Sequence, residues 1–300
     1  MSAATRTPRP PRTAPTGPPP AAARPRRLPR PTPGGVLAAV LGVFLAVVWL
    51  MPLVWAVLTS LKPEAETTAV PLRWLPLEPT FAAYQAVIER GDLQRWLLNS
   101  VVVSVLVTAL TLVVCVLAAY AFSKTEFPGR AWLFALFVAG ILVPPQALIV
   151  PLFDQMSVLG MVDTYWGVAL PQVVAPVMVF ILKRFFDAIP RDYEEAARLD
   201  GAGHLRVLWS VVVPMSGPVL AAVGIFTFVQ AWNNFLWPFV ATADPALMTV
   251  PVGLGTVQGS YGIQYAQEMA AAVLGALPLV AVFLLFQRHV VRGVTDAGLK

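Results

Sequence analysis

Six long stretches of the chain hold apolar and small polar residues, with no charged side chain and no histidine. They cover residues 36–60, 97–122, 131–152, 166–182, 214–240 and 269–287. A helix needs roughly 20 apolar residues to cross the hydrocarbon core of a bilayer, and about 17 is the lower limit. Each stretch therefore predicts one crossing, and we expect an all-α integral membrane protein with a bundle of six transmembrane helices.

The composition supports a membrane protein. Apolar residues make up 57% of the chain and charged residues 12%, whereas ordinary soluble domains hold roughly 45–50% and about 25%. A surface with so few charges would not keep this chain in water. The single cysteine, Cys115, excludes an internal disulfide and a cysteine-built metal site, and its apolar neighbours predict a packing role.

Residues 1–34 differ from the rest of the chain, which we treat as one domain over residues 35–300. They hold eleven prolines and seven arginines and no acidic residue, so they are expected to form a disordered cytoplasmic tail. No aromatic side chains lie between the arginines, which favours contact with anionic lipid over nucleic acid. The apolar stretch that follows is too long for a cleavable signal peptide, whose core is about 7–15 residues, so we interpret it as an uncleaved anchor.

The distribution of lysine and arginine predicts the orientation of the spans. The side that carries the N-terminus holds seventeen of these residues: seven in the tail, two in residues 123–130, five in residues 183–213 and three after residue 287. The opposite side holds four, all in its first loop. Because cytoplasmic loops carry the excess of positive charge, both termini are expected in the cytoplasm of a bacterial cell.

The sequence contains no catalytic machinery of its own. The spans lack the ionisable group that a proton-coupled carrier needs, although backbone carbonyls could still bind sodium. No lysine follows a glycine, so there is no phosphate-binding loop. Two histidines and one cysteine supply neither a metal site nor a hydrolase triad. Uphill transport would therefore need energy from a partner, and neither a cofactor nor a metal is expected in this chain.

The loop between the fourth and fifth stretches, residues 190–214, predicts two short cytoplasmic helices. Pro190 ends the preceding helix and Asp192 is a candidate N-cap for the next one, whose first turn holds two glutamates. Gly201 and Gly203 then break the helix. A second helical segment leads to Pro214, which suits the first turn of the fifth span.

This loop resembles the EAA loop of ABC-importer permeases. The residues Glu195-Ala196-Ala197, then three residues, Gly201, nine residues and Val211-x-Val213-Pro214 match that pattern, with valine in place of the usual isoleucine and leucine. Two sequence segments, IPRDYEEAARLDGAG and FVQAWNNFLWP, are similar to those of the carbohydrate branch of the family. Within this branch they resemble the subunit type of the smaller maltose-system permease. The resemblance covers roughly residues 36–300.

The resemblance implies a permease subunit of an ATP-driven carbohydrate importer, with no enzyme activity of its own. Its partners would be a cytoplasmic ATPase dimer that binds the ATP, a second permease and an extracellular or periplasmic sugar-binding protein. The EAA loop would dock on the ATPase as a coupling helix, rather than merely connect two spans. The residues implied in this coupling are Glu194, Glu195, Ala196, Ala197, Asp200, Gly201 and Pro214.

Amide and indole side chains in the fifth stretch are candidates for the substrate path. They are Gln230, Trp232, Asn233, Asn234 and Trp237. Sugars are recognised by amide hydrogen bonds and by contact with aromatic faces. The alternative is that the two asparagines tie helices together. The position of Asn233, roughly 29 Å along a helix that starts at Pro214, predicts that these residues lie near the outer edge of the membrane.

Three other functions are consistent with parts of this pattern. An ion-coupled secondary carrier would work alone with an ion gradient, and a membrane scaffold would bind an ATPase-like partner without moving solute. Within the importer class, a polyol or another neutral solute could replace sugar. The sequence does not choose among mono-, di- and oligosaccharides.

Overall fold

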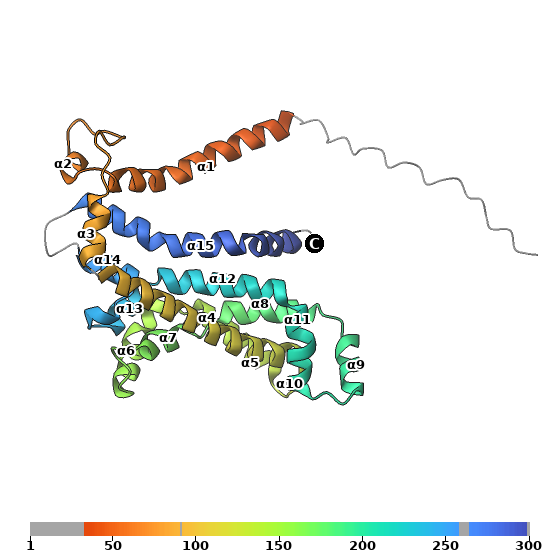
Figure 1. Ribbon diagram of the computed structural model, residues 1–300. Helices are drawn as coiled ribbons and strands as arrows, with labels where there is room; N and C mark the ends of the chain where they lie inside the picture. The colour runs from red at the N-terminus through yellow and green to blue at the C-terminus, as the bar shows by residue number, and fades with distance from the viewer. Residues whose placement is uncertain (1–32, 91, 258–263, 299–300) are drawn as a thin grey trace, which may run out of the picture. The chain divides into compact units, whose positions relative to one another are not determined.

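The computed structural model describes residues 33–90, 92–257 and 264–298, and every regular element in these ranges is a helix (Figure 1). The chain divides into two compact units, Met1–Leu50 and Met51–Lys300. Most of the expected tail, residues 1–32, lies outside the described residues. The fold is therefore all-α over the described ranges, as the sequence predicts.

The first unit contributes the beginning of α1 (Pro33–Ser60), which continues into the second unit. Its 28 residues include the first apolar stretch and correspond to about 42 Å at 1.5 Å per residue. Pro52 lies inside the helix. This length and composition are sufficient for one membrane crossing.

The second unit holds most of the helices. In chain order they are α2 (Glu64–Thr67), α3 (Ala82–Arg90), α4 (Asp92–Lys124), α5 (Arg130–Ala139), η1 (Gly140–Leu142), η2 (Pro145–Leu148), α6 (Ile149–Val158), α7 (Tyr165–Ala169), η3 (Leu170–Gln172), α8 (Pro176–Asp187), α9 (Asp192–Leu199), α10 (His204–Val207), η4 (Leu208–Val212), α11 (Val213–Met215), α12 (Gly217–Asn233), α13 (Leu236–Ala241), η5 (Pro245–Leu247), α14 (Val250–Val257) and α15 (Tyr265–Gly298). Figure 1 shows α4, α8, α12 and α15 running along one another, and α4 contacts both α8 and α12.

Three of the six apolar stretches do not form straight helices. Within the described residues, α1, α4 and α15 are continuous and long enough to cross a membrane, whereas three further candidate spans are pairs of helices bent by 96°, 53° and 84°. The first two bends lie at Val143–Pro144 and at Val173–Ala175, next to prolines that remove backbone donors. The stretches at 131–152 and 166–182 are thus broken rather than uniform.

The fifth stretch also begins later than its composition suggests. We expected the span to start at Pro214, but that residue belongs to α11, which continues the segment formed by α10 and η4. The chain turns sharply at Ser216, and α12 then starts at Gly217 with Pro218 in its first turn. Pro218, like Pro214, suits a helix start because its missing amide hydrogen is not needed there.

Helix α4 is the central element of the apolar core. At its C-terminal half it packs in a cluster with α8, η4 and α12, in which Leu182, Phe186, Leu208 and Val212 are fully buried. At its N-terminal end Trp96 packs in a second cluster with residues of α3, α12 and α15. Both ends of α4 are therefore held by apolar contacts.

Polar side chains near the start of α4 hold the segment that leads into α14. The Asn99 amide donates to the carbonyl oxygens of Ala246 and Met248, both at 2.9 Å, and the Tyr165 hydroxyl donates to Asn99 at 2.6 Å. Ser100 accepts a hydrogen bond from the backbone nitrogen of Val250 at 2.8 Å. These bonds satisfy backbone groups that are not paired within a helix, which membrane proteins require.

Candidate functional site

The EAA loop forms a short exposed helix that ends at a left-handed glycine. Figure 1 shows α9 at one end of the bundle, beside α10. Gly201 has a φ of +81°, and the backbone nitrogens of Gly201 and Ala202 donate to the carbonyl oxygens of Arg198 and Ala197. This pair of bonds is the Schellman arrangement, which favours glycine at the left-handed position. Gly201 therefore ends α9 as expected from the sequence.

The first turn of α9 differs from the expectation in one detail. Asp192 is the first helical residue rather than the N-cap, and no side chain caps this end of the helix. Asp192, Glu194 and Glu195 instead place three carboxylates in the first turn. Negative charge at this end is favoured because the backbone N–H groups there are not paired within the helix.

The two neighbouring glutamates of the EAA loop have opposite environments. Glu195 is exposed, whereas Glu194 is 5% exposed and pairs with Lys124 at the end of α4. Consecutive residues of a helix point about 100° apart, so one glutamate faces the bundle and the other faces outward. Glu194, predicted among the coupling residues, thus belongs to the inner face of α9.

The outward surface of the EAA loop combines small, acidic and apolar side chains. Ala196, Asp200, Gly201 and Pro214 are exposed together with Glu195, and Ala197 is half-buried. Leu199 is 90% exposed, and Tyr193 and Leu205 are also exposed. Exposed leucine and tyrosine side chains beside small residues are typical of a protein–protein contact surface.

A cavity of about 540 Å³ lies at the other end of α12, where three segments of the chain leave helical geometry. Five amide side chains line it: Gln146, Gln172, Gln230, Asn233 and Asn234. We call it the amide cavity. Its apolar walls include Val107 of α4, Met178 of α8 and Trp237 of α13. The lining contains no charged residue among the described residues, which matches the chemistry of an uncharged, hydroxyl-rich ligand.

Breaks in the helices place three of the five amides in this cavity. Gln146 follows the Pro144–Pro145 break, Gln172 precedes the break before α8, and Asn234 is the first residue after α12. The Asn234 side chain donates to Oε1 of Gln172 at 2.7 Å and so joins two of the breaks. In a membrane, non-helical backbone is tolerated where it is buried in protein or lines a water-filled cavity.

Thr227 is another polar residue that lines the amide cavity. The residue is 6% exposed, and its Oγ1 has no hydrogen-bond partner in the described part of the chain. A buried hydroxyl without a partner is costly.

The predicted path residues separate into two groups. Gln230, Asn233, Asn234 and Trp237 line the amide cavity, and the Trp237 indole donates to the carbonyl oxygens of Gly167 and Val168 at 3.2 and 3.1 Å. Trp232 does not line it. This residue is buried in the apolar cluster around Trp96 and stacks on Phe228.

Gln146 and Gln172 were missed by the sequence interpretation, which considered the fifth stretch alone. Both glutamines stand directly after a proline. Prolines inside an apolar stretch predict a break in the helix, and polar side chains at such breaks are candidates for a binding site in a membrane. A proline followed by a glutamine within an apolar stretch is therefore the sequence signal that indicates this part of the cavity.

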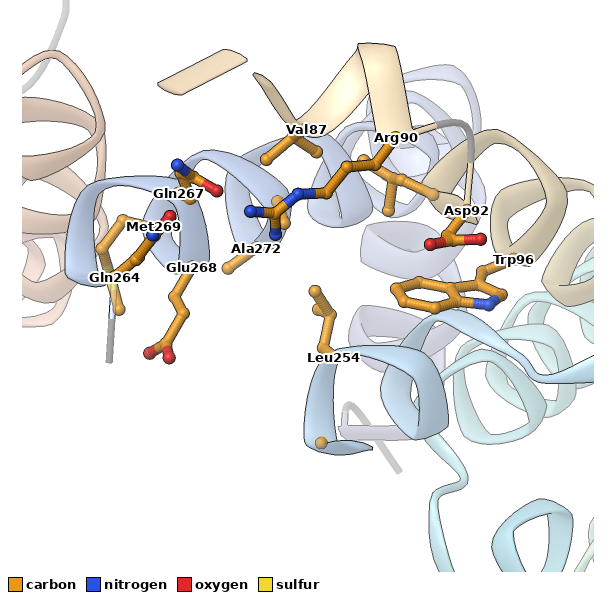
Figure 2. Close-up of a pocket in the computed structure, with 13 residues that line it drawn as sticks. Val87, Arg90, Asp92, Trp96, Leu254, Gln264, Gln267, Glu268, Met269 and Ala272 are labelled. Atoms are coloured by element: carbon orange, nitrogen blue, oxygen red, sulfur yellow. The ribbon is translucent and has the colours of Figure 1, made fainter. Parts of the chain in front are cut away.

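A second pocket, of about 290 Å³, lies between α3, α4, α14 and α15 (Figure 2). Figure 2 shows Asp92 beside the indole of Trp96 and Arg90 extending from α3 over the pocket. Gln267 and Glu268 enter from the first turn of α15. None of the predicted site residues lines this pocket, so the candidate substrate path is the amide cavity.

Comparisons with known proteins place the chain in a transport family. The family model described as "binding-protein-dependent transport system inner membrane component" matches residues 112–296. The sulfoquinovosyl glycerol transport system permease protein SmoH of Agrobacterium fabrum is 40% identical over 253 residues, 84% of this chain and 89% of that protein. The trehalose/maltose transport system permease protein MalG of Thermococcus litoralis is 34% identical over 271 residues, 88% of this chain and 96% of that protein.

A solved structure shares the fold. A chain of a bacterial ABC transporter involved in the import of the acidic polysaccharide alginate matches 85% of this chain and 95% of its own length, with a TM-score of 0.75 and 24% identity. The fold similarity and the family match confirm the resemblance carried by the EAA loop. The chain therefore belongs to the family of inner membrane components of binding-protein-dependent transport systems, which are permease subunits and not enzymes.

Proposed function

We propose that this chain is a permease subunit of an ATP-driven importer for a carbohydrate or glycoside. The observation that carries the proposal is the amide cavity, an uncharged cavity lined by five amide side chains, three of which lie at helix breaks. Amide side chains form hydrogen bonds with sugar hydroxyls, and neither group needs to be charged. The relatives whose names mention a sulfoquinovosyl glycerol, arabinooligosaccharides, and trehalose and maltose support the same class of substrate.

The exposed surface of the EAA loop is proposed to dock on a separate ATPase subunit. Glu195 and Ala196 are exposed and supply a carboxylate beside a small side chain, and Leu199 supplies an exposed apolar side chain. This surface lies at one end of α12 and the amide cavity at the other, about 26 Å apart along a 17-residue helix. The ATPase would thus act on the loop, at a distance from the substrate.

A second permease and a binding protein would complete the importer. The amide cavity opens to the surface of this subunit, so a homologous permease would close the path. The family description includes a binding protein, which would deliver substrate at the end opposite the EAA loop. The charge distribution supports a cytoplasmic EAA loop and cytoplasmic termini in a cell membrane.

Uptake by a deletion strain tests the substrate class. Cells that lack this gene and carry it on a plasmid are given radiolabelled neutral mono-, di- and oligosaccharides, a glycoside and an amino acid. The proposal predicts saturable uptake of one group of carbohydrates that disappears without the gene. Uptake of the amino acid alone, or carbohydrate uptake that does not depend on the gene, would contradict it.

A further inference from the structure

A buried ion pair joins the EAA loop to α4. Lys124 is the last residue of α4, and its Nζ lies 2.6 Å from Oε1 of Glu194 in α9, with the two side chains 4% and 6% exposed. The Lys124 ammonium also donates a 2.9 Å hydrogen bond to the carbonyl oxygen of Ile189. One cation therefore holds the loop at two points, just before α9 and within its first turn.

The residue before Lys124 adds a third attachment. The Ser123 hydroxyl donates to Oδ1 of Asp187 at 2.7 Å, at the C-terminal end of α8. The other oxygen of Asp187 pairs with Lys183 on the same helix, in a partly exposed i,i+4 contact. Ser123 and Lys124 together fix the chain that leads from α8 into α9.

Helix α9 has weaker contacts besides the ion pair: Arg198 lies 3.5 Å from Nδ1 of His204, which in turn lies 3.5 Å from the Tyr120 hydroxyl of α4. Glu194 is the buried residue of this eight-residue helix, and Ala197 is the apolar residue that packs partly against the core. So short a helix is not stable by itself and depends on tertiary contacts. A buried ion pair contributes little net stability compared with an apolar pair, because both charges lose their hydration, but it can specify a geometry.

Helix α4 connects the ion pair to the amide cavity without a break. Its 33 residues run from Asp92 to Lys124, and Val107, which lines the cavity, lies 17 positions before Lys124. At 1.5 Å per residue this separation is roughly 26 Å of continuous helix. A displacement of α9 that is passed to Lys124 therefore reaches one wall of the cavity through a rigid element.

We propose that Lys124 and Glu194 are a positioning pair that makes α9 and α4 move as one body when the ATPase closes. The inference rests on the proposed function, because it needs an ATPase that acts on the EAA loop. Glu194 then transmits the motion inside the subunit, whereas its neighbour Glu195 faces the ATPase. The two adjacent carboxylates thus have different roles.

The test uses the complete importer in proteoliposomes, with the second permease, the ATPase and the binding protein. Lys124→Met and Glu194→Gln each remove one charge, Lys124→Arg keeps the charge, and Lys183→Met breaks the exposed pair as a matched control. In the first two variants we expect the amount of sugar transported per ATP hydrolysed to fall roughly tenfold or more. A loss of this size lies within the range of typical coupling factors between two sites of a protein. Lys124→Arg and Lys183→Met should stay within about twofold of the unmodified protein.

A distance measurement separates positioning from general damage. Spin labels at Glu126→Cys and Asp192→Cys, both exposed positions outside the proposed docking surface, are placed in a Cys115→Ala background. The unmodified pair should give a narrow distance distribution, and Lys124→Met and Glu194→Gln should broaden it. The double variant Lys124→Met/Glu194→Met leaves no unpaired buried charge, so it should assemble and still show the broad distribution and weak coupling.

Three results would overturn the inference. They are normal transport per ATP in either single variant, lost transport with an unchanged narrow distribution, and normal coupling in the double variant. These results differ from a failure of the proposed function. In that case the unmodified importer itself would hydrolyse ATP without moving sugar.

Discussion

The side-chain amide of Asn234 donates a 2.7 Å hydrogen bond to Oε1 of Gln172, across the amide cavity wall. Asn234 follows the last residue of α12, and Gln172 ends η3 just before the chain turns into α8. The bond therefore joins two interrupted helices at the place where both present polar side chains. The shape of this part of the cavity depends on the contact.

Loss of this contact should slow transport. In Asn234→Leu, Oε1 of Gln172 loses its partner, and a typical hydrogen bond of this kind contributes about 0.5–1.5 kcal/mol. We expect roughly a tenfold lower uptake rate at saturating loaded binding protein, and a similar loss in Gln172→Leu. If the two residues act as a unit, the double variant is no worse than either single one. Additive losses in the double variant would contradict this interpretation.

Asn233 should affect substrate preference but not stability. Its Nδ2 donates to the carbonyl oxygen of Val229 in its own helix at 2.9 Å, and within the described residues no hydrogen bond joins its side chain to another helix. The side chain also lines the amide cavity. We expect Asn233→Leu to raise the half-saturating sugar concentration or change the order of preferred sugars, with an unchanged melting temperature in detergent. An unaltered uptake profile would remove Asn233 from the substrate path.

Replacement of Thr227 by valine should leave the stability of the protein unchanged or raise it, and should lower transport. Thr227→Val keeps the shape of the side chain and removes a buried hydroxyl that has no partner within the described residues. The melting temperature should therefore stay the same or rise. If the hydroxyl binds substrate, uptake falls several-fold, and Thr227→Ser restores it. A fall in melting temperature together with unchanged uptake would assign the hydroxyl a structural role.

The conformation of Gly201 should be required for coupling. A Cβ at this position meets no neighbour within 4 Å, so the obstacle to substitution is the φ of +81° and not a steric contact. A left-handed conformation costs a residue with a Cβ about 1–2 kcal/mol. We expect Gly201→Val to reach the membrane but to abolish uptake, while Gly201→Asn retains more activity.

Gly203 provides the matched control for this experiment. It has a φ of −74° and equally open surroundings, so Gly203→Ala should transport normally. Equal losses at the two glycines would show that any substitution in the loop is harmful. Normal uptake by Gly201→Val would contradict the docking of a helix that ends at this residue.

The course of the EAA loop was predictable because local chemistry determines it. Gly201 is required at a left-handed helix end, and the carboxylates of residues 192, 194 and 195 favour a helix start. The different environments of Glu194 and Glu195 were not predictable from spacing. They depend on Lys124, a residue 70 positions earlier that only the packing of α4 brings to the loop.

The amide cavity was only partly predictable. The cluster of amides in the fifth stretch indicated Gln230, Asn233 and Asn234, but the same window also included Trp232, which faces the opposite side of α12. Helical residues in sequence point in different directions, so a window of neighbours does not define a face. Gln146 and Gln172 join the cavity because separate helices break at the same level, which is a tertiary property.

Reconstitution with and without the ATPase tests whether a separate ATPase drives transport through this permease. Proteoliposomes that hold the two permeases and the ATPase are given loaded binding protein on one side and ATP on the other, and matched vesicles lack the ATPase. We expect radiolabelled sugar to accumulate only when both the ATPase and ATP are present. Accumulation in vesicles without the ATPase, driven by a proton or sodium gradient, would contradict it.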